Sequence, residues 1–108
     1  MRVSITERHC DVPRKIIERT EALIGRLSKY EQKATAADVV YSDEKHTRKV
    51  EVIIHIDGAA NVVGRGEGTD FRSALDQVVD RLRRMLSEQR DRRRDHQAPP
   101  LAGEATVE

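Results

Sequence analysis

The sequence predicts an α+β domain with the order β-α-β-β-β-α, a four-stranded mixed sheet with two helices packed on one face. Two stretches, residues 11–30 and 70–94, carry apolar residues at helical spacing. Between them, residues 49–56 place an aliphatic side chain at every second position, as a half-buried strand does. Each helix has one apolar face, so both should cover the same side of the sheet. We expect residues 1–94 to form this domain and residues 95–108 to be a disordered tail.

The first two strands should be parallel. Residues 2–6 and 37–41 alternate between apolar and polar side chains, and the segment between them is helical. A strand-helix-strand crossover joins parallel strands by a right-handed connection. Asp11 followed by Pro13 marks the start of the helix, with the carboxylate as its cap and proline in its first turn. The apolar face of this helix consists of Ile16, Ile17, Thr20, Leu23, Ile24 and Leu27.

The later strands are joined by tight turns and should be antiparallel. The charged stretch 42–47 is one turn, and Asp57-Gly58 is a typical hairpin dipeptide. The fourth strand begins near Ala60 and should fray in residues 64–68, where every second residue is glycine. A glycine-rich segment before a helix can bind phosphate, but this one lacks the Gly-Lys-Ser/Thr ending of a P-loop and the dinucleotide spacing. We therefore predict a flexible strand exit.

The second helix should be capped by Thr69 or Asp70. Within it, Asp76 and Asp80 lie one turn apart and could hold a divalent ion. Pairing with arginines at helical spacing is favoured over that alternative. The arginines at suitable spacing are Arg72, Arg83 and Arg84. The core face of the helix consists of Phe71, Ala74, Leu75, Val78, Leu82 and Leu86.

Positive charge is concentrated toward the end of this helix, although the whole chain has a formal net charge of only +1. Residues 81–94 hold seven arginines against Glu88 and Asp91, a net charge of +5. Cations favour the negative end of a helix, but seven arginines exceed that need. We interpret the block as a surface for a polyanion, most simply nucleic acid. A second basic stripe, within roughly 80° of arc on the first helix, consists of Lys15, Arg19, Arg26 and Lys29.

Other function classes have little support in the sequence. No apolar run approaches the roughly 18 residues of a membrane span, and the first residues lack the apolar region of a secretory signal. The single cysteine, Cys10, excludes an intramolecular disulfide and fits a reducing compartment. We find neither metal-ligand spacing nor a catalytic Ser/His/Asp or Cys/His set. We expect a cytoplasmic protein that is not an enzyme, uses no cofactor or metal, and binds neither a membrane nor a small-molecule substrate.

Five segments, in this order and spacing, carry a family resemblance. They are Ile5-Thr6-Glu7-Arg8-His9, Arg26-Leu27-Ser28-Lys29-Tyr30, Asp43-Glu44-Lys45-His46, Asp70-Phe71-Arg72-Ser73-Ala74-Leu75-Asp76 and Asp80-Arg81-Leu82-Arg83-Arg84-Met85-Leu86. The chain resembles, over about residues 1–92, the ribosome hibernation promoting factor / ribosome-associated inhibitor A family, also called sigma-54 modulation proteins. The resemblance implies the same β-α-β-β-β-α fold, similar to a double-stranded RNA-binding domain.

The resemblance also implies a partner and a mechanism. Family members bind the small ribosomal subunit and its rRNA in the channel between head and body, where mRNA and tRNA would lie. Translation then stops by steric occlusion under stress or in stationary phase, without catalytic residues. The chain resembles the short members, and we expect it to be one of those without the C-terminal dimerisation domain of the long members. Some of these promote ribosome pairing with a helper protein and others block it. We expect a monomer off the ribosome.

The basic side chains on the outer sides of the two helices should bind rRNA phosphates and should not recognise individual bases. Carried over by position, the family pattern assigns rRNA contacts to Arg26, Lys29, Lys45, His46, Arg81, Arg84 and Arg90. Additional basic contacts are expected at Lys15, Arg19, Arg72, Arg83, Arg92, Arg93 and Arg94. The chain departs from the family at Phe71, usually Tyr, at Arg83, often acidic, and at Ser87, often basic. The rRNA footprint should differ accordingly.

Two alternatives come from other functional classes. The chain could be a protein-interaction module that modulates a sigma factor through its basic helix, or a generic double-stranded RNA binder that acts off the ribosome. RNA binding of either kind weakens steeply with salt. Binding to a protein partner gives one saturable complex whose energy lies in a few hot spots.

Overall fold

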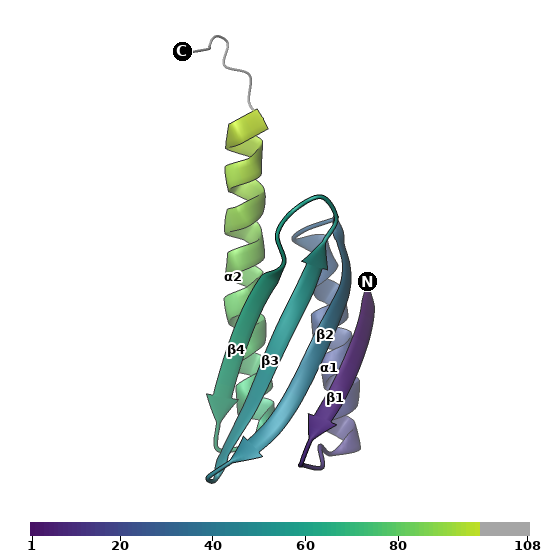
Figure 1. Cartoon of the computed structure of the whole chain (residues 1–108), viewed down its shortest axis with the longest axis vertical. Helices are drawn as coiled ribbons and strands as arrows, with labels where there is room; N and C mark the ends of the chain where they lie inside the picture. The colour runs from purple at the N-terminus through teal and green to yellow at the C-terminus, as the bar shows by residue number, and fades with distance from the viewer. Residues whose placement is uncertain (98–108) are drawn as a thin grey trace.

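The fold is a four-stranded sheet with both helices on one face, as the sequence predicts (Figure 1). The computed structural model describes the backbone of residues 1–97 and the side chains of residues 1–92. The sheet order is β1-β2-β3-β4. Its elements are β1 (Arg2–Arg8), α1 (Arg14–Gly25), the 3-10 helix η1 (Arg26–Lys29), β2 (Ala34–Glu44), β3 (Thr47–Ile56), β4 (Val62–Gly68) and α2 (Phe71–Gln97).

The strand directions follow the connections. β1 pairs with β2 in parallel, and in that register Ile5 lies beside Val39. The β2–β3 and β3–β4 pairs are antiparallel, because each is closed by a short turn. A break in register between Ala34 and Ala36 lets β2 begin earlier than the expected residue 37. The parallel pair and the two hairpins together give the predicted mixed sheet.

The core lies between the sheet and the two helices. Val39, Val52 and Ile54 of the sheet and Leu75 and Leu82 of α2 are all fully buried in it, so the core is aliphatic as expected. One buried polar pair interrupts it. The hydroxyls of Thr20 on α1 and Tyr41 on β2 lie 2.5 Å apart.

The Thr20–Tyr41 pair ties α1 to the sheet by a hydrogen bond as well as by packing. Thr20 also donates to the carbonyl of Ile16 at 2.6 Å, so Tyr41 donates to Thr20. The ring of Tyr41 meets that of Phe71 edge-on, with centroids 5.4 Å apart. Burial raises the pKa of the Tyr41 phenol above its ordinary value.

The start of α1 differs from the prediction. Pro13 occupies the N-cap position, with φ −56° and ψ 144°, and no side chain caps the helix. Asp11 is therefore not the cap. Its neighbour Val12 donates its backbone N–H to Glu7 of β1 at 2.6 Å, which fixes the chain between the strand and the helix. Proline supplies the pre-set φ of a helix entry without a side-chain acceptor.

The C-terminal ends of both helices differ from the prediction. α1 ends at Gly25, and the chain reaches Tyr30 through the tighter 3-10 turn η1. α2 begins as predicted from Asp70, whose carboxylate accepts the N–H of Ser73 at 2.7 Å. That bond lowers the pKa of Asp70. α2 runs to Gln97, three residues into the segment expected to be a tail, and residues 98–108 lie outside the described residues.

The prediction of a flexible strand exit at residues 64–68 is wrong, because β4 continues in register through Gly68. The glycines face α2, where a side chain has no room. A Cβ on Gly64 would lie 2.7 Å from Leu82, and one on Gly66 would overlap the backbone carbonyl of Ala74. The alternating glycines are therefore a flat strand surface onto which the helix backbone packs directly, rather than a phosphate loop.

This close approach gives a stability prediction. Gly66→Ala should lower the free energy of unfolding by at least about 2 kcal/mol, because neither β4 nor the backbone of α2 can move away without disturbing the core. Gly25→Ala is the matched control. Gly25 has helical φ of −59° and open space around it, so alanine there should be neutral or stabilising by up to about 1 kcal/mol. Urea unfolding of the three proteins measures both changes. Equal stability of Gly66→Ala and wild type would contradict the packing argument.

Candidate nucleic-acid interface

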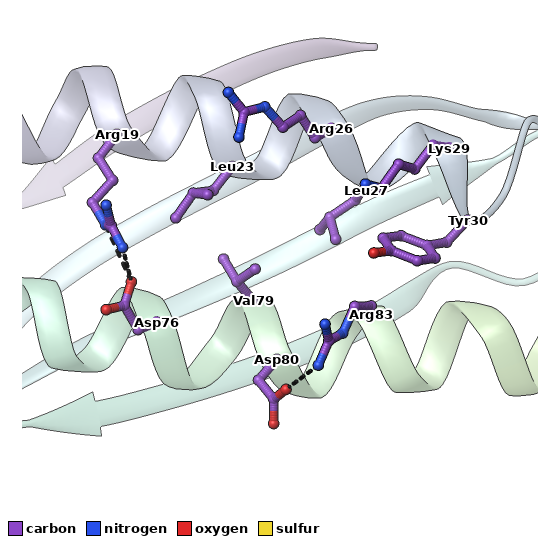
Figure 2. Close-up of a pocket in the computed structure, with 10 residues that line it drawn as sticks. All are labelled: Arg19, Leu23, Arg26, Leu27, Lys29, Tyr30, Asp76, Val79, Asp80 and Arg83. Carbon is purple, nitrogen blue, oxygen red and sulfur yellow. Dashed lines mark hydrogen bonds and ion pairs between the residues drawn. The ribbon is translucent and has the colours of Figure 1, made fainter.

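A groove between α1 and α2 is lined by four of the predicted basic residues, Arg19, Arg26, Lys29 and Arg83 (Figure 2). The groove has a volume of about 320 Å³. Leu23 and Leu27 from the α1 side and Val79 from α2 form its apolar walls. Arg26 and Lys29 lie at its α1 rim, and the Arg26 side chain extends away from α2 in Figure 2. The groove is thus apolar inside and cationic at its edge.

Carboxylates of α2 hold the arginines around this groove. Asp80 accepts from Arg83 and from Arg84, each at 2.7 Å, as predicted from helical spacing. Asp76 was expected to pair in the same way, and that prediction is wrong. Its Oδ1 accepts from the Nη2 of Arg19 at 3.0 Å and from its Nε at 3.2 Å. Tertiary packing brings α1 within reach, so the inter-helix pair replaces the local one.

The predicted basic stripe on the first helix is therefore divided. Arg19 is half-buried and turned toward Asp76, while Lys15, Arg26 and Lys29 are exposed. The Nζ of Lys29 lies 5.2 Å from the ring centre of Tyr30, a cation–π contact that keeps the ammonium at the surface. Among the described residues, neither Lys29 nor Arg26 has an ion pair, so both charges are available to an outside anion.

The arginines of α2 occupy more than one side of the helix. Arg81 is exposed and donates to the carbonyl of Arg65 on β4 at 2.6 Å, on the side away from Arg83. Arg90 is half-buried, and its Nε has no hydrogen-bond partner within the described part of the chain. Arg92 is exposed. The side chains of Arg93 and Arg94 lie outside the described residues, although the helix backbone continues through both.

Lys45 and His46 lie at the opposite end of the sheet from Arg26 and Lys29 (Figure 1). The whole of β2, 11 residues long, separates the two sets, a distance of about 30 Å at the usual rise of a strand. Arg72, at the start of α2, lies at the same end as the Lys45–His46 turn. The predicted contacts thus fall into two sets, which we call the helix surface, at η1 and on more than one side of α2 (Arg26, Lys29, Arg81, Arg83, Arg84, Arg90), and the hairpin surface (Lys45, His46, Arg72).

The Lys45–His46 turn is conformationally unusual. Glu44 pairs with Thr47, so the loop has two residues, with φ of 50° at Lys45 and 67° at His46. These are the angles of a type I′ turn, which normally contains Asn-Gly because most side chains disfavour positive φ. Next to it, Lys49 and Glu44 pair at 2.6 Å, which lowers the pKa of Glu44 and raises that of Lys49. Lys45 and His46 are both exposed, and their positive φ angles place them in strained conformations.

One basic residue at the hairpin surface was missed in the sequence. Arg48 lies in β3, half-buried, with its guanidinium 5.4 Å from the ring centre of Phe71 and 2.9 Å from Asp43. Arg48 could not be predicted from its place in an alternating strand, because only the fold shows that α2 begins beside this end of β3. Phe71, noted as a departure from the family, is thereby the aromatic partner of a cation.

Across the described side chains, no group of three His, Cys, Asp or Glu residues could hold a metal ion. In the same part of the chain no helix has the length and apolar character needed to cross a membrane. Cys10 is partly buried near the carbonyl of Tyr41, and burial raises the pKa of its thiol.

Residues 3–94 match the family model described as Sigma 54 modulation protein / S30EA ribosomal protein. The chain belongs to this family. Among its curated relatives, the ribosome hibernation promoting factor of Azotobacter vinelandii is 30% identical over 97 residues, which are 90% of this chain and 90% of that protein. The protein of the same name from Escherichia coli strain K12 is 26% identical over 96 residues, covering 89% of this chain and all of that one.

Solved structures have the same fold as this S30EA-family chain. A ribosomal subunit interface protein from Coxiella burnetii superposes with a TM-score of 0.78 at 18% identity, over 84% of this chain and 99% of that one. The N-terminal domain of Thermus thermophilus Protein Y gives a TM-score of 0.73 at 24% identity, over 82% and 99%. At these identities the likeness concerns the fold, and it confirms the predicted β-α-β-β-β-α architecture.

The strained turn gives a second prediction. Replacing Lys45-His46 by Asn-Gly should raise the free energy of unfolding by about 1 kcal/mol or more, because Asn and Gly adopt positive φ at a lower energetic cost. The double variant Lys45→Ala with His46→Ala removes the same side chains and leaves the strain, so it should not be stabilised. Thermal unfolding followed by circular dichroism compares the two. Equal melting temperatures for Asn-Gly and Ala-Ala would contradict the strain argument.

Proposed function

We propose that this chain is a ribosome-associated hibernation factor that binds small-subunit rRNA in the mRNA and tRNA channel and thereby prevents translation under stress or in stationary phase. The name shared by relatives that it covers over nearly their full length supports this function. The observation that carries the mechanism is the exposed helix surface, whose cations Arg26 and Lys29 are not consumed by ion pairs among the described residues. Such groups suit phosphate oxygens.

The proposed mechanism is occlusion by a rigid body. A four-stranded sheet with a packed helix layer fills space, and a factor that blocks a channel by its volume needs no reacting group. Arg26 and Lys29 of the helix surface lie about 30 Å from the Lys45–His46 turn along β2, so these two ends would contact backbone phosphates at separate points of the folded RNA. The strained positions of Lys45 and His46 support a role for their side chains in binding, because backbone strain is concentrated at functional sites.

Co-sedimentation with isolated small subunits and whole ribosomes tests the proposal. The series should span several salt concentrations, with naked duplex RNA as competitor. We expect stoichiometric binding that resists the competitor and blocks mRNA loading. The affinity should fall by about 0.7–0.9 log units per phosphate contact for each decade of salt. Loss of binding to any duplex RNA would favour the generic RNA binder. Absence of binding would favour a protein partner such as a sigma factor.

Charge reversal at two arginines of α2 tests the helix surface. Arg81→Glu combined with Arg84→Glu should weaken subunit binding at least about 100-fold, because two phosphate contacts become repulsions. Both side chains are exposed, so stability should change by less than about 1 kcal/mol. The control is Arg2→Glu with Arg14→Glu, which makes the same change in net charge on exposed residues of β1 and the start of α1 and, like the first pair, breaks one surface ion pair. Near-normal binding by the first pair, or equal loss by the control pair, would show that the helix surface is not the site.

A further inference from the structure

Asp80 holds two guanidinium groups of the helix surface, those of Arg83, which lines the groove, and Arg84. Its Oδ1 accepts from the Nη2 of Arg83 and its Oδ2 from the Nη2 of Arg84, each at 2.7 Å. The carboxylate is thus shared by arginines three and four residues further along α2, one to each oxygen. All three side chains are roughly half exposed or more, so this arrangement stands at the surface and not in the core.

The shared carboxylate affects how these arginines can meet a phosphate. A free arginine side chain has much rotamer freedom, which it loses when it binds. Two adjacent guanidinium groups also repel each other, and a carboxylate between them removes that repulsion. Each arginine uses only its Nη2 on Asp80, which leaves Nε and Nη1 to donate to another acceptor. Asp80 therefore presents two oriented donor groups at fixed places on the helix.

A carboxylate at this place has the opposite effect on an arbitrary polyanion. Binding to any duplex RNA depends on the number of phosphates that are neutralised, and every acidic group in the surface reduces that attraction. A surface that only needed to hold RNA would gain from an uncharged residue at position 80. Asp80 is thus unfavourable for generic binding and favourable for binding at a site whose phosphates match the two guanidinium groups.

We propose that Asp80 is a positioning residue that orients Arg83 and Arg84 and so makes the helix surface selective for its structured rRNA site over duplex RNA in general. This inference rests on the proposed function. In this proposal, Asp80 is the residue that makes the helix surface prefer its rRNA site over duplex RNA. Net charge alone cannot provide that preference.

Asp76 differs from Asp80 although it is one turn away. It pairs with Arg19 of α1 and links the two helices, so its loss would change the groove itself. Asp80 pairs only within α2 among the described residues, and exposed pairs at this spacing add little to stability. Replacement of Asp80 should therefore alter binding without altering the fold, which makes it the suitable residue for a test.

The experiment compares Asp80→Asn with Glu88→Gln. Both variants remove one negative charge from α2, and Glu88 is exposed with no ion pair among the described residues. Affinity is measured for small subunits by co-sedimentation and for a naked RNA duplex by fluorescence anisotropy, at one salt concentration near 0.1 M. Thermal unfolding of each variant is measured in parallel, and we expect melting temperatures close to that of the wild type.

We expect the Asp80→Asn variant to bind duplex RNA about threefold more tightly, since the surface gains one unit of positive charge. It should bind small subunits at least about fivefold more weakly, because the two arginines lose their orientation. Glu88→Gln should bind both RNAs equally well or somewhat more tightly. This opposite response at position 80 alone supports the proposal, and a purely structural defect would weaken both kinds of binding.

Two outcomes overturn the proposal while leaving the proposed function intact. If Asp80→Asn and Glu88→Gln both strengthen subunit binding, Asp80 acts only as a negative charge. If Asp80→Asn weakens duplex and subunit binding alike, the residue supports the helix instead of selecting the target. A wild-type protein that binds no subunits overturns the proposed function itself, and this inference with it.

Discussion

The direct packing of α2 on β4 is the contact that the rest of the molecule depends on. Gly64, Gly66 and Gly68 give β4 a face without side chains, and Leu82, Val78 and the backbone at Ala74 occupy the space. Because the helix lies against the strand backbone, its rotation about its own axis is fixed. That rotation places Leu75 and Leu82 in the core and turns Arg83, Arg84 and Asp80 toward solvent. The position of the helix surface is thus determined by three glycines of a strand.

The second helix layer follows from this placement. With α2 fixed on β4, α1 packs beside it over the other strands, tied to β2 by the Thr20–Tyr41 hydrogen bond and to α2 by the Arg19–Asp76 pair. An exposed ion pair adds little to stability, so it is the buried hydroxyl pair and the apolar contacts that hold α1 in position. The Arg19–Asp76 pair instead neutralises two charges inside the groove and leaves the unpaired cations at its rim.

The sequence was sufficient for the features that depend on periodicity. The alternation in residues 50–56 predicted β3, and the helical spacing after Asp70 predicted α2 with its cap and core face. It was insufficient where the outcome depends on a neighbour that lies far along the chain. The glycines at 64–68 predicted a flexible segment, because glycine weakens a strand. Only the close approach of the α2 backbone explains why glycine stands at these positions. Asp76 and Arg19 are 57 residues apart, so their pairing could not be read from helical spacing.

The site shows the same division. Residue type and helix position were enough to place Arg26, Lys29, Arg81 and Arg84 at the surface, and the structure exposes all four. Residue type could not predict the strained turn at Lys45 and His46, because a two-residue loop with positive φ depends on the register of β2 against β3. Arg48 was missed since its partner Phe71 comes from α2.

The separation of the two cationic surfaces bears on how the domain could act. β2 and β3 are long, hydrogen-bonded on both sides and buried on one face, so they hold the hairpin turn at a fixed distance from η1 and the middle of α2. A flexible chain with the same charges could adapt to any RNA, and its affinity would reflect charge alone. A rigid spacer between two sets of phosphate-binding groups accepts only an RNA whose backbone passes both. Under the proposed function, the sheet therefore contributes to selectivity as well as to the bulk that would block the channel.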